Sequence, residues 1–254
     1  KEAYRVLAGK DPKKVRPYDI EQFLASNNLL RKKVLDQFVN YRQEWRNPSA
    51  HDYTIDFDED EALIAIVSVT VFAIVLTDQI DGKIAFTAAA SAPPSQDLSP
   101  AEKKAPLLEL VTNKAREFAC THIDIAGPTN SHAHDYYRLE GALAGFLSAE
   151  LSILSDVSVE QNSKFASSEA DIVVRRGSEK IIVELKRVIN KSNVKTMVQR
   201  AMTQVALYLH EDDVVGAVVL VYATEGAEYD TYPGVGALSK IVRIISPKSN
   251  AKVI

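Results

Sequence analysis

The chain has 254 residues and the composition of an ordinary folded protein, with 46% hydrophobic and 25% charged side chains. Its net charge of −4 excludes a uniformly basic nucleic-acid-binding protein, although residues 161–254 alone are net +3. Its single cysteine, Cys120, excludes an intrachain disulfide, and no signal peptide or membrane span is recognised, so we expect a cytoplasmic protein.

The first part of the chain is expected to be helical, over residues 2–10, 19–45 and 59–80. Four acids at 58–61 suit the first turn of a helix, and an apolar run follows them at 62–76. This run is too short to span a bilayer comfortably, so we expect a buried helix and no contact with a membrane. Its many β-branched residues leave a strand as the alternative.

A short motif, Arg46-Asn47-x-x-x-His51, lies between these helices. It resembles the motif of the HEPN superfamily, whose helical domains often form dimers and sometimes cleave RNA without a metal. The resemblance implies a homodimer through this domain and an alternative ribonuclease site at Arg46, Asn47 and His51. Without such activity, Asn47 is the cap of a short helix and His51 makes a structural hydrogen bond. The acids at 56–61 count against RNA binding nearby.

A segment of small residues and prolines at 87–100 is typical of a linker. We therefore expect a helical domain at 1–90 and a second domain at 91–254, joined by a linker at about 85–99. Ser99-Pro100-x-Glu102 matches a helix capping box, which predicts a helix over 100–118. A further amphipathic helix is expected over 134–151, and it carries Glu140.

The stretch 170–186 predicts a β-hairpin with two carboxylates and a lysine at one end. Gly177-Ser178 suits the turn, and a turn there pairs Val174 with Ile181 and Asp171 with Glu184. Directly opposed residues share a face of the sheet, and Lys186 lies on the same face, two residues further along. A divalent metal would neutralise the two carboxylates, whereas the alternative is a solvated cluster of ion pairs.

A helix is expected over 196–209, followed by a buried strand over 214–221. Gln204 and Tyr208 lie four residues apart and therefore share a face of that helix. Five basic residues and no acid occur between 185 and 210, a composition that suits a phosphate backbone or a solvated helix face. The candidate nucleic-acid contacts are Arg187, Lys191, Lys195 and Arg200.

Asp171, Glu184-x-Lys186 and the later Gln204-x-x-x-Tyr208 together resemble the PD-(D/E)xK superfamily of restriction-endonuclease-like nucleases. The resemblance implies an α/β fold with a mixed sheet flanked by helices. It implies that Asp171 and Glu184 bind Mg²⁺ or Mn²⁺, with the carbonyl of Leu185 as a third ligand. Lys186 would then orient the attacking water, Gln204 would position the lysine or the water, and Glu140 would be the helix glutamate that the superfamily often contributes. Gln204 and Glu140 are otherwise ordinary helix-surface residues. No proline precedes Asp171, which is a departure from the family pattern.

Together these features predict a magnesium-dependent endonuclease, with DNA favoured over RNA as its substrate. A metal-independent ribonuclease and a non-catalytic nucleic-acid-binding or dimerisation module are the alternatives. Both families recur in bacterial defence against phage, so a role as a defence effector is an expectation by association. Because the chain begins with Lys, we also expect an upstream domain or a partner subunit.

Overall fold

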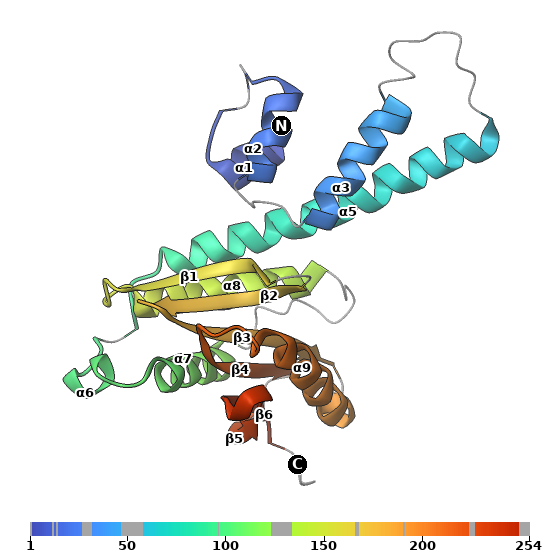
Figure 1. Cartoon of the computed structure of the whole chain (residues 1–254). Coiled ribbons are helices and arrows are strands. Elements are labelled where there is room, and N and C mark those ends of the chain that lie inside the picture. Colours follow the sequence, from blue (N-terminus) through green and yellow to red (C-terminus); the bar gives the residue numbers. More distant parts are fainter. Residues whose placement is uncertain are drawn as a thin grey trace. The chain divides into compact units, whose positions relative to one another are not determined.

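The computed structural model describes most of the chain. The described residues are 2–11, 13, 15–26, 32–46, 58–95, 97–122, 134–165, 168–189, 191–223 and 227–248. Within them the protein is α/β: helices come first, and a six-stranded mixed sheet packed with helices follows (Figure 1). The chain divides into two compact units, residues 1–84 and 85–254, with the boundary inside one long helix. That helix ends at Ala90, so residues 85–90 of the expected linker are helical.

The first unit consists of helices around a small core. Its elements are α1 (Glu2–Ala8), α2 (Pro17–Ser26), α3 (Lys32–Tyr41), the π-helical turn η1 (Arg42–Arg46) and the first part of α5 (Glu59–Ala90). Tyr4, Ile20 and Leu24 form the core. Phe38 of α3 stacks on Phe72 of α5, with 5.0 Å between the ring centres. The expected helices of this part therefore form within the described residues, with α2 described up to Ser26 and α3 from Lys32.

Helix α5 differs from the expectation of a buried helix. It has 32 residues, and large apolar side chains along it are exposed, including Leu63 at 59% and Ile66 at 61%. The expectation of burial was wrong because, among the described residues, Phe72, Leu76 and Ile80 pack on the other helices of the unit while most large apolar side chains before them stay exposed. By length and composition, α5 is the one helix among the described residues that could cross a membrane. An 18-residue stretch of it has a mean hydropathy of 2.2, and 11% of this stretch is buried.

The second unit contains the sheet, whose strands lie in the order β1-β2-β3-β4-β6-β5. Strands β3, β4 and β6 are parallel to one another, whereas β1, β2 and β5 are antiparallel to their neighbours. The sheet is therefore mixed, with an antiparallel hairpin at one side. The strands are β1 (Val157–Phe165), β2 (Ser168–Arg176), β3 (Glu179–Val188), β4 (Val214–Ala223), β5 (Tyr229–Val235) and β6 (Ile241–Pro247).

Helices cover both faces of this sheet. Helices α7 and α8 pack on one face through Phe118 and Leu143, and α9 packs on the other through Ala201 and Val205 (Figure 1). Burial on both faces explains the nearly continuous apolar runs of β3 and β4. The remaining elements of this unit are α6 (Pro100–Lys103), α7 (Leu107–Thr121), α8 (His134–Leu151), η3 (Lys191–Asn193), α9 (Val194–Tyr208) and η4 (Ala237–Ser239).

Two polar features hold the beginning of the second unit. The capping box expected at Ser99 forms, with Glu102 returning a hydrogen bond to the Ser99 backbone, although the helix breaks after Lys103 and resumes as α7. Buried Lys114 of α7 forms an ion pair with buried Glu150 of α8 at 2.6 Å. Glu150 also accepts a 2.6 Å hydrogen bond from the backbone N–H of Ser95. This network fixes the segment after α5 to the α7–α8 pair.

Each of the two border strands of the sheet carries one residue that is unusual in a regular strand. In β1, Asn162 has a left-handed backbone with φ of 52°, and the β1–β2 ladder is interrupted there, opposite Asp171. Asparagine is one of the few residues that adopt this conformation readily. In β5, Pro233 provides no backbone N–H for pairing.

Candidate functional site

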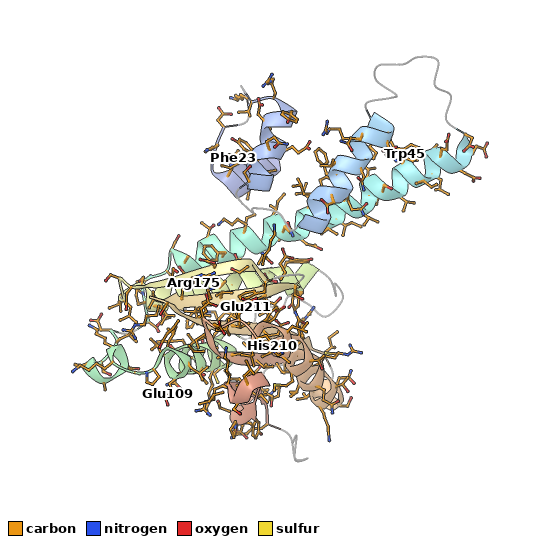
Figure 2. The ribbon with its side chains drawn as sticks, viewed as in Figure 1. Phe23, Trp45, Glu109, Arg175, His210 and Glu211 are labelled. Carbon is orange, nitrogen blue, oxygen red and sulfur yellow. The ribbon has the colours of Figure 1, made fainter. Side chains whose placement is uncertain are left out.

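The hairpin of β2 and β3 carries the two acids to one place. Gly177 has φ of 57°, which fits its position in the tight turn. The expected register is confirmed, because Val174 pairs with Ile181 and the ladder ends at Ile172 and Val183. Asp171 and Glu184 are the next residues in this register, so they occupy facing positions just beyond the ladder. Figure 2 shows Arg175 on the same hairpin, near its turn.

Asp171 is held within β2 by two hydrogen bonds to one oxygen. Its Oδ2 atom accepts from the backbone N–H of Leu185 and from the hydroxyl of Tyr136, both at 2.9 Å. The side chain is buried, and these charge-assisted hydrogen bonds compensate for the loss of hydration. They also fix the orientation of the carboxylate.

Glu184 is completely buried, with 0% of its surface exposed. Its Oε1 atom forms an ion pair with Nζ of Lys186, whereas its Oε2 atom is buried without a hydrogen-bond partner among the described residues. Burial and the nearby negative charge of Asp171 raise the pKa of Glu184 to about 8, although Lys186 opposes the shift. Among the described residues, Lys186 pairs with Glu184, whereas the donors to Asp171 are uncharged.

A chain of hydrogen bonds connects Lys186 to helix α9. Nζ of Lys186 donates to Oε1 of Gln204 at 3.2 Å, and Nε2 of Gln204 donates to the hydroxyl of Tyr208 at 2.9 Å. The Tyr208 hydroxyl donates to the carbonyl of Glu169 at 2.7 Å, which returns the chain to β2. Burial raises the pKa of Tyr208 to about 12, so it remains a neutral donor at physiological pH. The structure thus brings together Asp171, Glu184, Lys186 and Gln204.

Glu140 lies on helix α8, the same helix as Tyr136, whose hydroxyl contacts Asp171. It is buried in α8, with 1% of its surface exposed, and its charge acts on Tyr136, one helical turn away. Among the described residues, no three His, Cys, Asp or Glu side chains gather closely enough to form a metal site by themselves. A role for Glu140 as a metal ligand therefore stays a prediction.

The basic residues expected to contact nucleic acid are spread over three elements. Lys195 and Arg200 are exposed on α9, and Arg200 lies one turn before Gln204. Arg187 is half-buried and, by the alternation of a strand, lies on the opposite face of β3 from Lys186. Lys191 belongs to η3, but its side chain lies outside the described part. His210 and Glu211, seen in Figure 2, directly follow α9 and its C-cap.

The alternative ribonuclease site lies mostly outside the described residues. Arg46 is the last residue of η1, but its side chain is not among those described. Asn47 and His51 also fall outside the described residues.

The donor set around Glu184 fits a hard divalent cation. Asp171, Glu184 and the Leu185 carbonyl supply oxygen ligands, which Mg²⁺ and Mn²⁺ prefer. The unpartnered, buried Oε2 atom of Glu184 is the observation that carries this fit, because such an atom costs free energy unless a proton or a cation binds it. Comparison with protein-family models and with curated proteins finds no match.

The sequence analysis did not identify Tyr136 of the site, or Asn162 next to it. Tyr136 contacts both Asp171 and the Leu185 carbonyl, and its only signal was its position four residues before Glu140 on the same helix face. Asn162 lies opposite Asp171 in β1, and its only signal was a polar residue inside a strand. Irregular pairing next to functional residues is common, because it changes the direction of a neighbouring side chain.

Proposed function

We propose that the protein is a divalent-metal-dependent nuclease whose second unit is restriction-endonuclease-like. One observation supports this most directly. Two carboxylates meet beside a lysine at the end of a hairpin, and one carboxylate oxygen is buried without a partner. Among the described side chains, Lys186 is the cation paired with Glu184, and Asp171 accepts from uncharged donors, so the pair can take up a cation in exchange for a proton.

Asp171 and Glu184 would hold Mg²⁺ or Mn²⁺ together with the Leu185 carbonyl. When bound there, the cation would polarise the scissile phosphate and lower the pKa of the attacking water. Lys186 would donate hydrogen bonds to that water or to the phosphate as negative charge develops. Gln204 would hold the lysine in place, because it already accepts a hydrogen bond from Nζ. Because its pKa is raised to about 8, Glu184 would carry a proton at neutral pH, and this proton would leave when the cation binds.

DNA is the proposed substrate class, with RNA as the alternative outcome of the test. Lys195 and Arg200 are exposed on the helix that carries Gln204, and no acid occurs between residues 185 and 210. A local excess of basic side chains attracts a phosphate backbone in spite of the negative net charge of the whole chain.

A cleavage assay on linear and circular DNA and on RNA, with Mg²⁺ or Mn²⁺ and with EDTA, tests this function. We expect cleavage of DNA that EDTA abolishes and that Asp171→Asn and Glu184→Gln each reduce at least about 100-fold. Lys240→Ala, which removes a lysine on the η4–β6 loop, is the matched control and should cleave as the wild type does. No cleavage with either metal would leave a binding or dimerisation module.

The helical unit is proposed to be HEPN-like, on the motif at Arg46, Asn47 and His51. EDTA-resistant cleavage of RNA that is lost in His51→Ala and survives Asp171→Asn would assign the activity to that motif. Such a result would overturn the metal-dependent proposal, because the two sites predict opposite responses to EDTA.

The apolar side of α5 is proposed to contact a second copy of the chain, within a cytoplasmic homodimer. Its uncharged run, Ala62–Thr77, has 16 residues. At about 1.5 Å per residue this covers roughly 24 Å, less than the roughly 30 Å of a bilayer core. Four acids precede the run, and Asp78 and Gln79 directly after it are buried within the protein. The short length of the run and the polar residues at both of its ends favour contact with a protein surface over contact with lipid.

A further inference from the structure

Tyr136 brings a hydroxyl from helix α8 to the two strands of the candidate site. Its Oη atom lies 2.9 Å from Oδ2 of Asp171 and 3.0 Å from the carbonyl oxygen of Leu185. The ring also packs against the hydrophobic cluster between α7, α8 and the sheet, which restricts its movement. A tyrosine hydroxyl is protonated at neutral pH, so the Oη atom has a proton to donate.

This hydroxyl has one proton and two acceptors. The proton goes to the Asp171 carboxylate, since an ionised acceptor makes the stronger hydrogen bond. Oδ2 of Asp171 then has both of its lone pairs engaged, one by Tyr136 and one by the Leu185 N–H. Two oxygens remain available: Oδ1 of Asp171 and the carbonyl oxygen of Leu185. Asp171 is the next residue after the β2–β3 register, opposite Glu184, and Leu185 follows Glu184 in the chain.

We propose that Tyr136 is a positioning residue of the cation site: by occupying Oδ2 of Asp171, its hydroxyl leaves Oδ1 and the Leu185 carbonyl for the cation that Glu184 binds. The proposal rests on the proposed nuclease function and adds a residue from a third element to it. Tyr136 would contact neither the substrate nor the cation, and would act through Asp171.

Calorimetric titration of the full chain with Mn²⁺ tests this role without any cleavage. Tyr136→Phe keeps the ring and removes the hydroxyl, and Asp171→Asn removes a ligand. Tyr232→Phe is the matched control, because Tyr232 also donates to an aspartate, Asp230, at 3.2 Å on β5. We expect the wild type and Tyr232→Phe to bind equally, Asp171→Asn to lose binding, and Tyr136→Phe to bind about 10- to 100-fold more weakly.

Wild-type affinity in Tyr136→Phe would overturn the proposal, and tighter binding would show instead that the hydroxyl competes with the cation. Absence of Mn²⁺ binding by the wild type would overturn both this inference and the nuclease function. Normal binding behaviour without any cleavage of DNA or RNA would overturn the nuclease function alone.

Hydrogen exchange at the Leu185 amide gives a second test, which needs no variant and is independent of whether Tyr136→Phe folds. In the proposed arrangement this N–H stays on Oδ2 of Asp171, so its protection should be the same with and without Mg²⁺. Loss of protection when Mg²⁺ binds would mean that the cation takes Oδ2, and would overturn the positioning role.

Discussion

Nζ of Lys186 donates a 3.2 Å hydrogen bond to Oε1 of Gln204, which joins strand β3 to helix α9 through the two side chains. The lysine also forms the ion pair with Glu184. Its position is therefore set from two directions, by the strand that carries it and by the helix that covers the sheet. This arrangement is suited to holding a charge in place rather than exposing it to solvent.

Replacing Lys186 with alanine should reduce the rate of metal-dependent DNA cleavage at least about 100-fold, because the variant loses the donor for the developing negative charge. Gln204→Ala should reduce the rate less, since the ion pair with Glu184 still holds the lysine. Lys180→Ala is the control: this lysine lies on the same strand, paired with Asp213 at the other end. Initial rates with saturating Mg²⁺ measure the effect, and an unchanged rate in Lys186→Ala would remove the lysine from the mechanism.

The metal-free protein should lose stability as the pH rises from about 4.5 to 8. In this range Glu184 is ionised in the unfolded chain but protonated in the folded protein, because its pKa is raised to about 8. The unfolded state then binds fewer protons, so the free energy of unfolding falls as pH increases, by about 1 to 3 kcal/mol. Urea denaturation at pH 5 to 8 measures it, and Glu184→Gln should flatten the profile.

The buried ion pair between α7 and α8 should be sensitive to loss of one partner. Lys114→Met leaves Glu150 buried with only Ser95 to compensate for its charge. We expect a loss of about 3 kcal/mol in the free energy of unfolding. The double variant Lys114→Met/Glu150→Leu should recover much of it, because no buried charge remains. A double variant as unstable as the single one would contradict this account.

A side chain at Gly145 of α8 should disturb the packing of the end of α5. A Cβ atom there would lie 2.4 Å from the carbonyl oxygen of Phe86 and 2.8 Å from Cβ of Ala89. Gly145→Ala should therefore reduce the free energy of unfolding by about 1 to 3 kcal/mol, despite the better helix propensity of alanine. Thermal denaturation checks this result, and a stabilised variant would show that the helices approach less closely than described.

The exposed side of α5 should decide the oligomeric state. Ile66→Asp and Val71→Asp each place a charge on the apolar surface, and each should convert a dimer to a monomer in light scattering after size exclusion. Glu59→Lys, at the exposed start of the helix, is the control for a change of charge alone. A wild type that is monomeric and floats with phospholipid vesicles would assign this surface to a membrane instead.

Local sequence patterns predicted the β2–β3 hairpin, strand β4 and the helices α7, α8 and α9 of the second unit, but not strands β1, β5 and β6. The glycine of the turn and the β-branched flanks were enough to predict the register of the hairpin, and with it the facing positions of Asp171 and Glu184. The spacing of Gln204 and Tyr208 predicted a shared helix face, where the two side chains are hydrogen-bonded. These predictions held because each depends on neighbours in sequence or across a single turn.

Contacts between residues far apart in the sequence could not be predicted from the sequence. Tyr136 reaches Asp171 from 35 residues away, through the packing of α8 on the sheet, and no sequence period reports such a contact. The expectation for α5 was wrong for the same reason. The sequence identifies an apolar helix, but it does not show which of its sides other parts of the protein cover.

The irregular border strands limit how this protein can associate. An unpaired strand edge is a template for the backbone of another chain, and many sheets risk fibrous aggregation there. Here Pro233 has no backbone N–H, and the left-handed Asn162 interrupts the pairing of β1 with β2, so neither border strand is regular over its full length. Addition of strands from other chains to these borders is therefore disfavoured, which protects the protein from fibrous aggregation at high concentration.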